Sequence, residues 1–328
     1  MKRNYLFILM VAILVMGFEA CSEDDEDESV SIIDLSTVTA DLTLQNGDVV
    51  TGKLTAQVKI SIADGATVTF KGDTIKGAIA MENPWPGIIC KGNATIKLAD
   101  GTTNIVSPFG QCYPGIYVPV GKTLNIRGNT GELRVRGSRA AAIGGGSTGI
   151  SDGVAVINYE NVDCGNILIE GGVILATASM EAASIGAGIN AKCGDITIQG
   201  GRTIARATNG PAIGSVSGGS CRRIVIRGGI IEATTSWDQS PAIGSSGWLG
   251  KGKFEEISIT SGITSLTATG GDGTTIPPIG KGAKDASSGY VVIDNKVNPD
   301  ASWDGDGMKS LMLTKPEGSN NTWKLERK

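Results

Sequence analysis

Apolar and polar residues alternate in short runs along most of the chain. Val58-Lys59-Ile60-Ser61-Ile62 alternates, Asp64-Gly65 follows, and Thr67-Val68-Thr69-Phe70 alternates again. Alternation with a period of two places every second side chain on one face of a β-strand, and Asp-Gly favours a tight turn. The same strand-turn pattern returns at residues 94–101 and 123–137. The pattern predicts an all-β protein, and no heptads or long amphipathic helical runs interrupt it.

A triplet of two small residues and an isoleucine repeats along the same region. Its isoleucines are separated by 28, 27, 42, 28, 30 and 36 residues, and glycine directly follows the last five. The seven isoleucines are Ile88, Ile116, Ile143, Ile185, Ile213, Ile243 and Ile279. Repeats of this length are typical of solenoids, in which each period is one structural unit.

A second repeat keeps the same period. The segments 164–172, 193–201 and 221–229 each begin with cysteine, carry an Ile-x-Ile run and end in Gly-Gly. With a following apolar run and the triplet, each period contains three short strands. We therefore predict a right-handed parallel β-helix of about eight coils, three short strands per coil, with terminal caps. Two inward ladders should run through it, Ile167/Ile196/Ile224/Ile257 and Ile169/Ile198/Ile226/Ile259. A β-sandwich is the alternative, but it does not require such a period.

The start of the chain differs from the repeat region. Lys2 and Arg3 precede an uncharged apolar run, which is typical of a secretory signal peptide. Cys21 follows, as in a bacterial lipobox, although Phe18 and Glu19 depart from that pattern; an ordinary cleaved signal is the alternative. The acidic tract 23–28 cannot pack and should be solvated. We expect a lipoprotein signal peptide over 1–20, diacylation of Cys21 and an acidic flexible tether over 21–38.

The repeat region and the end of the chain complete this division. We expect the β-helix over 39–297 and a C-terminal β-hairpin cap over 298–328. The 42-residue interval between Ile143 and Ile185 indicates an inserted surface loop near 147–161.

Several of these motifs together resemble a known family. They are Leu98–Val106, Tyr113–Leu124, Ala142–Gly146 and Cys164–Ile167. The combination is similar to the repeat of a largely uncharacterised group of β-helical surface lipoproteins of the Bacteroidota type, some of them labelled carbohydrate-binding. The resemblance covers about residues 55–295. It implies secretion, a β-helix and an outer-membrane, cell-surface location, and it supplies no catalytic residue.

Charge and residue types narrow the possible chemistry. The chain has 29 Lys and Arg, 33 Asp and Glu and no histidine, and six of the acids lie in the tract 23–28. The nearly neutral remainder does not favour nucleic acid as a partner. The absence of histidine excludes catalysis by histidine and metal sites with histidine ligands. Glu255-Glu256 should point to opposite faces of a strand, and Asp304-x-Asp306 is either a cap turn or the start of a calcium loop. We expect no catalytic residue, cofactor or metal.

The cysteines allow two arrangements. Cys164, Cys193 and Cys221 should stack in successive coils, either as buried thiols or with one pair bridged. Cys90 and Cys112 lie in neighbouring coils and could also form a bridge.

Aromatic residues near the triplets are the candidate ligand-binding residues. Trp85 and Tyr113 each precede their isoleucine by three residues, so they should lie one coil apart at one corner. Exposed rings of this kind can stack on sugars, or they can pack on each other and shield the corner. The other candidates are Glu82, Asn83 and Gln111 near that corner, and Trp237 and Trp248 on a later coil. Outward Arg127, Arg134, Arg136 and Arg139 form either a patch for acidic glycans or a solvated face.

These observations favour a lipid-anchored, non-catalytic cell-surface protein that binds glycans or another surface partner through a β-helix face. Its partners would be the membrane, through the N-terminal lipid, and a polysaccharide or surface protein. A β-helical polysaccharide lyase or glycoside hydrolase and a purely structural, adhesive spacer are the alternatives.

Overall fold

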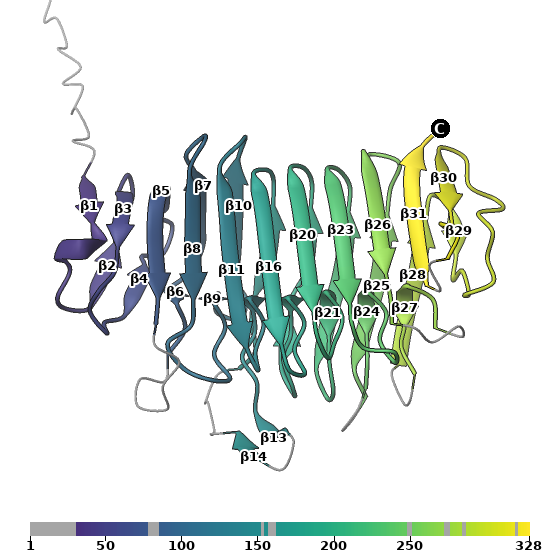
Figure 1. Ribbon diagram of the computed structural model, residues 1–328, viewed down its shortest axis with the longest axis horizontal. Helices are drawn as coiled ribbons and strands as arrows, with labels where there is room; N and C mark the ends of the chain where they lie inside the picture. The colour runs from purple at the N-terminus through teal and green to yellow at the C-terminus, as the bar shows by residue number, and fades with distance from the viewer. Residues whose placement is uncertain are drawn as a thin grey trace, which may run out of the picture.

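The computed structural model describes residues 31–77, 85–151, 154–156, 162–247, 251–271, 276–283, 287–318 and 321–328. Within these ranges the protein is all-β, and its one helical element is the short 3-10 turn η1 (Leu35–Thr37). No helix in the described ranges is long and apolar enough to cross a membrane. The strands form a 20-stranded, a 9-stranded and a two-stranded sheet. Figure 1 shows them side by side along the long axis, from the purple N-terminal end to the yellow C-terminal end.

The 9-stranded sheet contains the isoleucine triplets. Its strands pair in parallel from one period to the next, with Ile88 opposite Ile116, Ile116 opposite Ile143 and Ile143 opposite Ile185. The ladder continues through Ile213, Ile243 and Ile279, so the predicted stacking of the triplets is confirmed. The strands are β2 (Leu42–Leu44), β4 (Ile60–Ile62), β6 (Ile88–Cys90), β9 (Ile116–Tyr117), β12 (Ile143–Gly144), β17 (Ile185–Gly186), β21 (Ile213–Ser215), β24 (Ile243–Ser245) and β27 (Ile279–Lys281).

The first part of the 20-stranded sheet contains the Ile-x-Ile runs. Ile167, Ile196, Ile224 and Ile257 are in register, as are Ile169, Ile198, Ile226 and Ile259, which confirms both predicted ladders. The strands are β1 (Ile32–Asp34), β3 (Val49–Lys53), β5 (Thr67–Lys76), β7 (Ala94–Leu98), β10 (Thr123–Gly128), β15 (Asn166–Ile169), β18 (Lys192–Cys193), β19 (Ile196–Ile198), β22 (Ser220–Ile226), β25 (Lys253–Ile259) and β28 (Ser287–Ile293).

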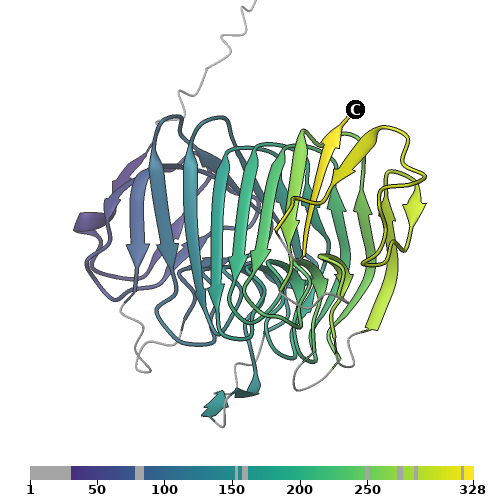
Figure 2. The same cartoon turned by 45° about the vertical axis from the view of Figure 1, so that its right-hand side comes forward.

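The second part of this sheet follows the first after a short turn in each period. It begins with the last residues of β5. The first part of β5 pairs with β7, and its last residues pair with β8. The strands are β8 (Thr103–Ser107), β11 (Glu132–Ser138), β16 (Val173–Ser179), β20 (Arg202–Ala207), β23 (Ile230–Thr235) and β26 (Ser265–Thr269), with β29 (Lys296–Val297), β30 (Leu311–Thr314) and β31 (Thr322–Arg327) at the C-terminal end. Figure 2 shows a front row of long strands with further strands behind and below it.

The topology is consistent with a β-helix. The chain visits the three strand groups in turn, as in β15, β16, β17 and then β19, β20, β21, and each strand pairs in parallel with its equivalent in the next period. The 20-stranded sheet is nevertheless mixed, because β31 pairs antiparallel with β26 and β30, and β29 pairs antiparallel with β28.

The two ends of the fold differ from the expected boundaries. Residues 31–38 had been assigned to the flexible tether, but β1 pairs in parallel with β3 and Leu35 is fully buried. This assignment was wrong because Ile33 and Leu35 supply apolar contacts that an acidic tether lacks. At the other end, Leu313 lies opposite Leu325 in an antiparallel pair, which is the expected hairpin. Strand β31 also covers the edge of β26, an addition that the sequence pattern did not indicate.

The insertion after the third triplet forms a small hairpin. Strands β13 (Gly149–Ser151) and β14 (Val154–Val156) pair antiparallel and project from the body at the bottom of Figure 1. Residues 152–153 and 157–161 of the expected loop lie outside the described residues.

The core is a column of aliphatic side chains. The alternation of inward and outward side chains along each strand can be tested. Ile198 is fully buried, whereas Thr197 beside it is half-buried and points outward. We expect Ile198→Ala to lower the free energy of unfolding by about 3 kcal/mol, because it removes contacts with the coils on both sides. Thr197→Ala should change it by less than about 0.5 kcal/mol. Urea denaturation measures both, and equal losses would contradict the assigned faces.

Candidate functional site

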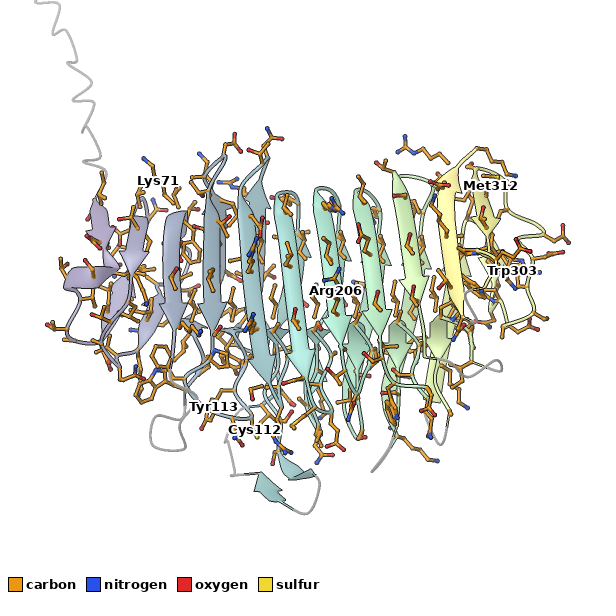
Figure 3. The ribbon with its side chains drawn as sticks, viewed as in Figure 1. Lys71, Cys112, Tyr113, Arg206, Trp303 and Met312 are labelled. Atoms are coloured by element: carbon orange, nitrogen blue, oxygen red, sulfur yellow. The ribbon has the colours of Figure 1, made fainter. Side chains whose placement is uncertain are left out.

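The aromatic corner expected at Trp85 and Tyr113 is not an exposed pair of rings. Tyr113 is only 7% exposed, so the alternative in which both rings face solvent is wrong. The backbone of the preceding residue explains this: Cys112 adopts a φ of 66°, its N–H donates to Ser138 O (2.7 Å), and its carbonyl accepts from Ser147 N (3.1 Å). These bonds tie the segment to the next coil and hold Tyr113 against the body (Figure 3).

Trp85 stacks on a different neighbour. Its ring lies 5.6 Å from that of Phe109 at 31°, and Lys59 Nζ lies 5.4 Å from the Trp85 ring centre. Trp85 is half-buried and packs against the core, so it shields the corner. Of the polar residues expected beside it, Gln111 is exposed, while Glu82 and Asn83 lie outside the described residues.

The later aromatic pair is only partly described. Trp237 is half-buried, and its backbone N–H donates to Thr235 Oγ1 (3.2 Å). Trp248 lies outside the described residues. The arrangement of these two rings therefore stays a prediction.

A different candidate surface lies on the outward side of the second strand group, from β5 to β26. Successive strands pair in register here, so each outward residue lies beside its equivalent on the next strand. We call one such set the hydroxyl and cation row; Arg206 marks it in Figure 3. Its members, in order, are Lys76, Ser107, Arg136, Thr177, Arg206, Thr234 and Thr269.

The cations of this row differ from the others on the same face. Arg134 pairs with Glu132, Arg202 Nη2 with Glu232 Oε1 (2.6 Å), and Lys324 Nζ with Glu326 Oε1 (2.9 Å). Among the described residues, Lys76, Arg136 and Arg206 have no carboxylate partner. All three are exposed, so their positive charge is available to a ligand.

A groove of about 560 Å³ lies over the first part of the row. Its lining includes Lys76, Ser107, Arg136, Thr177 and Ser179. Ser107 is only 4% exposed, and its hydroxyl oxygen has no hydrogen-bond partner among the described residues. A buried hydroxyl without a partner costs free energy, but a ligand group would reach the Ser107 oxygen only after a local shift of the groove lining.

An aliphatic row runs beside the hydroxyl and cation row. Its apolar members are Ile105, Leu175 and Ile204, each two residues before a member of the first row on the same strand and each half-buried. The exposed Arg134 lies between Ile105 and Leu175 in this row. Two residues along a strand correspond to roughly 7 Å. The face therefore offers cations, hydroxyls and apolar side chains in parallel lines, the combination that binds a sugar ring with one apolar face.

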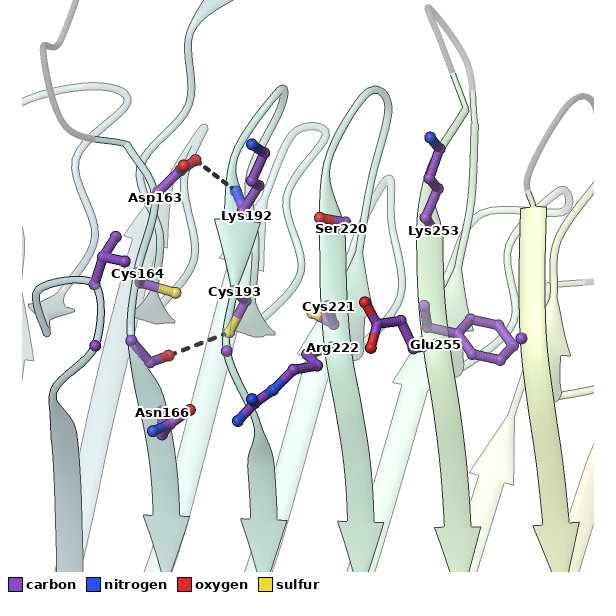
Figure 4. A pocket seen from close by; sticks show the side chains of 16 residues that line it. Asp163, Cys164, Asn166, Lys192, Cys193, Ser220, Cys221, Arg222, Lys253 and Glu255 are labelled. Carbon is purple, nitrogen blue, oxygen red and sulfur yellow. Dashed lines mark hydrogen bonds between the residues drawn. The ribbon is translucent and has the colours of Figure 1, made fainter.

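A second groove, of about 770 Å³, lies on the first strand group and is shown in Figure 4. Lys192, Lys253 and Glu255 are among its lining residues. Next to it, Asp195 accepts from Arg222 Nε (2.6 Å) and Arg223 Nη2 (2.5 Å). Burial raises the pKa of Asp195, but hydrogen bonds from Arg223 and Arg222 outweigh it and lower the pKa overall. A carboxylate whose pKa is lowered by an ion pair is unsuited to act as a general acid.

Glu255 and Glu256 do not lie on opposite faces, as alternation had suggested. Glu255 is exposed in the second groove, and Glu256 is half-buried beside Arg223 of the preceding coil's strand β22. Both carboxylates therefore reach the surface, which the period of two does not predict. The sequence interpretation missed this acid and arginine set because it treated β22 and β25 as regular strands.

The cysteine ladder lies at the base of the second groove. Cys193 and Cys221 are in register, and all five described cysteines are free, buried thiols. Cys221 Sγ donates to Gly214 O (3.0 Å). A hydrogen bond with Cys193, together with burial, raises the pKa of Cys164, and burial with a bond to Cys193 raises that of Cys221. The thiols of Cys164 and Cys221 are neutral and suited to packing, not to nucleophilic attack.

The acidic turn near the C-terminus is a hydrogen-bonded turn. Asp306 N donates to Asp304 Oδ1 (3.0 Å), which corresponds to the cap-turn alternative. The described residues contain no group of three potential ligands that could hold a metal ion.

Comparisons with protein families, curated proteins and solved structures find no match to this chain.

Proposed function

We propose that this chain is a lipid-anchored, non-catalytic cell-surface protein that binds glycans, or another surface partner, through one face of a right-handed parallel β-helix. The helix would comprise about eight coils of three short strands, with caps at both ends. The parallel register of equivalent strands and the 27- to 42-residue spacing of the isoleucine triplets support this architecture.

The observation that carries the binding proposal is the hydroxyl and cation row. Among the described residues, three cations without carboxylate partners share one line with four hydroxyl residues, and a groove whose lining includes Lys76, Ser107 and Arg136 lies over the first part of this line. Sugars present hydroxyls, ring faces and often carboxylates, and this face has a complementary group for each. The aromatic corner, with Tyr113 buried, does not support the proposal.

Two alternatives remain as outcomes of one experiment. A polysaccharide lyase or glycoside hydrolase would use the second groove, where Glu255, Glu256 and two arginines reach the surface. A structural or adhesive spacer would need no site. We expect a glycan array to show binding, and lyase and hydrolase assays on the same sample to show no turnover. Turnover would support the enzyme, and absence of both would support the spacer.

The anchor can be tested separately. Cys21 follows the apolar leader, lies before the acidic tract, and would be diacylated in a lipoprotein. We expect Cys21→Ala to shift most of the protein from the membrane fraction to soluble fractions, because the attached acyl chains supply the membrane affinity. Cell fractionation and immunoblotting measure this shift. Protection of the unmodified protein from protease on intact cells would contradict surface exposure.

A further inference from the structure

The cations of the hydroxyl and cation row recur at every second strand. Lys76 lies on β5, Arg136 on β11 and Arg206 on β20, while Ser107 on β8 and Thr177 on β16 lie between them. Adjacent strands lie about 4.8 Å apart, so successive cations are separated by roughly 10 Å along the molecule. The positive charge is therefore spaced regularly along a line perpendicular to the strands.

We infer that this face binds a linear acidic polysaccharide with one carboxylate per disaccharide, lying along the long axis of the protein. The inference rests on the proposed glycan binding and specifies the ligand class. An extended disaccharide has about the length of two strand spacings, so alternate sugars would present carboxylates to Lys76, Arg136 and Arg206. Arginine binds carboxylates through two parallel hydrogen bonds, which suits this role.

The groups between the cations fit the sugars between the carboxylates. Thr177 is exposed and can bond to sugar hydroxyls. Ile105, Leu175 and Ile204 lie beside the row and can contact the apolar face of a ring. The ion pairs of Arg134 and Arg202 reduce the free positive charge at the positions beside the row.

Other extended polyanions fit this spacing less well. Each strand of duplex DNA carries a phosphate about every 3.4 Å along the helix axis, which would leave most phosphates without a cation here. An acidic peptide in extended conformation places side chains on one face about every 7 Å. The face also lacks described aromatic rings on which bases could stack.

The test compares three oligosaccharides of equal length on the full chain in detergent. They are a hyaluronan fragment with a carboxylate on alternate sugars, an oligogalacturonate with one on every sugar, and a neutral chitin fragment. We expect the hyaluronan fragment to bind most tightly in calorimetry. Raising the salt from about 0.1 to 1 M, which shortens the Debye length from about 10 to 3 Å, should weaken it.

Matched variants then locate the site. Arg136→Gln and Arg206→Gln should each weaken hyaluronan binding at least about tenfold, since each removes a charge-assisted pair. Arg202→Gln removes the same charge from the same face, but from a paired position, and should change affinity less than about twofold. All three positions are exposed, so thermal unfolding should be unaltered in all three variants.

The outcomes separate this inference from the proposed function. If the oligogalacturonate bound as tightly as the hyaluronan fragment, the inferred spacing of one carboxylate per disaccharide would be wrong. If the chitin fragment bound as tightly, the inference that the ligand is acidic would be wrong. In both cases the proposed glycan binding would stand. If Arg202→Gln weakened hyaluronan binding as much as Arg136→Gln and Arg206→Gln, the hydroxyl and cation row would not be the binding site. No binding to any of the oligosaccharides or to the glycan array would overturn both proposals.

Discussion

Changing Asp73 to asparagine should stabilise the protein by about 4 kcal/mol at pH 7 and remove much of the pH dependence of its stability. Asp73 is fully buried in the N-terminal coils, and neither carboxylate oxygen has a hydrogen-bond partner among the described residues. Burial raises the pKa of Asp73 to about 8 from an ordinary value of 3.8. The folded protein therefore keeps this group protonated at neutral pH, whereas the unfolded chain ionises it.

The direction of the pH effect follows from proton binding. Between pH 4 and pH 8 the folded state holds a proton at Asp73 that the unfolded state has lost, so raising the pH favours unfolding. The loss amounts to about 1.4 kcal/mol per pH unit in this window and ends above the folded pKa. Asparagine has nearly the same shape as aspartic acid and does not ionise. The free energy of unfolding of the Asp73→Asn variant should therefore not fall with pH in this way.

Urea denaturation of both proteins from pH 4 to pH 9 measures the effect as a difference, because other titrating groups contribute equally to both. The curves should coincide near pH 4 and separate as the pH rises to 8. Asp238→Asn is the matched control at an exposed position and should follow the unmodified protein. A constant difference at every pH would show that asparagine acts through packing and not through the pKa of Asp73.

The sequence predicted the interior of the fold more closely than its surface. The ladders of Ile196 and Ile213 were predictable because a stack of equivalent coils needs the same residue at the same position in every period. A column of identical side chains leaves a periodic signal that one sequence can carry. The antiparallel contact of β31 with β26 has no such signal, because it is made once.

The candidate site shows the same limit. Arg136 was recognised as outward-facing from alternation, but Lys76 and Arg206 were not placed beside it. Aligning the second strand of each period would have found the row, since all its members follow from register. The burial of Tyr113 could not be found in this way, because it depends on the positive φ of Cys112 and on bonds to Ser138 and Ser147. The neighbouring Trp85 packs on Phe109, a partner outside the repeated triplets.

The glycine after each of the last five triplet isoleucines should be the least replaceable repeated residue. Gly214 adopts a φ of 141°, a conformation rare for residues with a side chain, and lies in register with Gly186 and Gly244. A Cβ at Gly214 would lie 1.8 Å from Gly244 O, a backbone atom of the next coil. We expect Gly214→Ala to lower the free energy of unfolding by at least about 4 kcal/mol, because coil stacking and backbone conformation are both disturbed.

Gly280 provides the matched control for this prediction. It has a φ of 130° and occupies the last position of the same ladder, where the nearest atom to an added Cβ, Pro277 Cγ, is 3.7 Å away. Gly280→Ala should therefore incur only the backbone strain, about 1 to 3 kcal/mol. Urea denaturation of both variants separates the two causes. The larger loss at Gly214 would measure the close approach of successive coils, and equal losses would assign the whole requirement for glycine to φ.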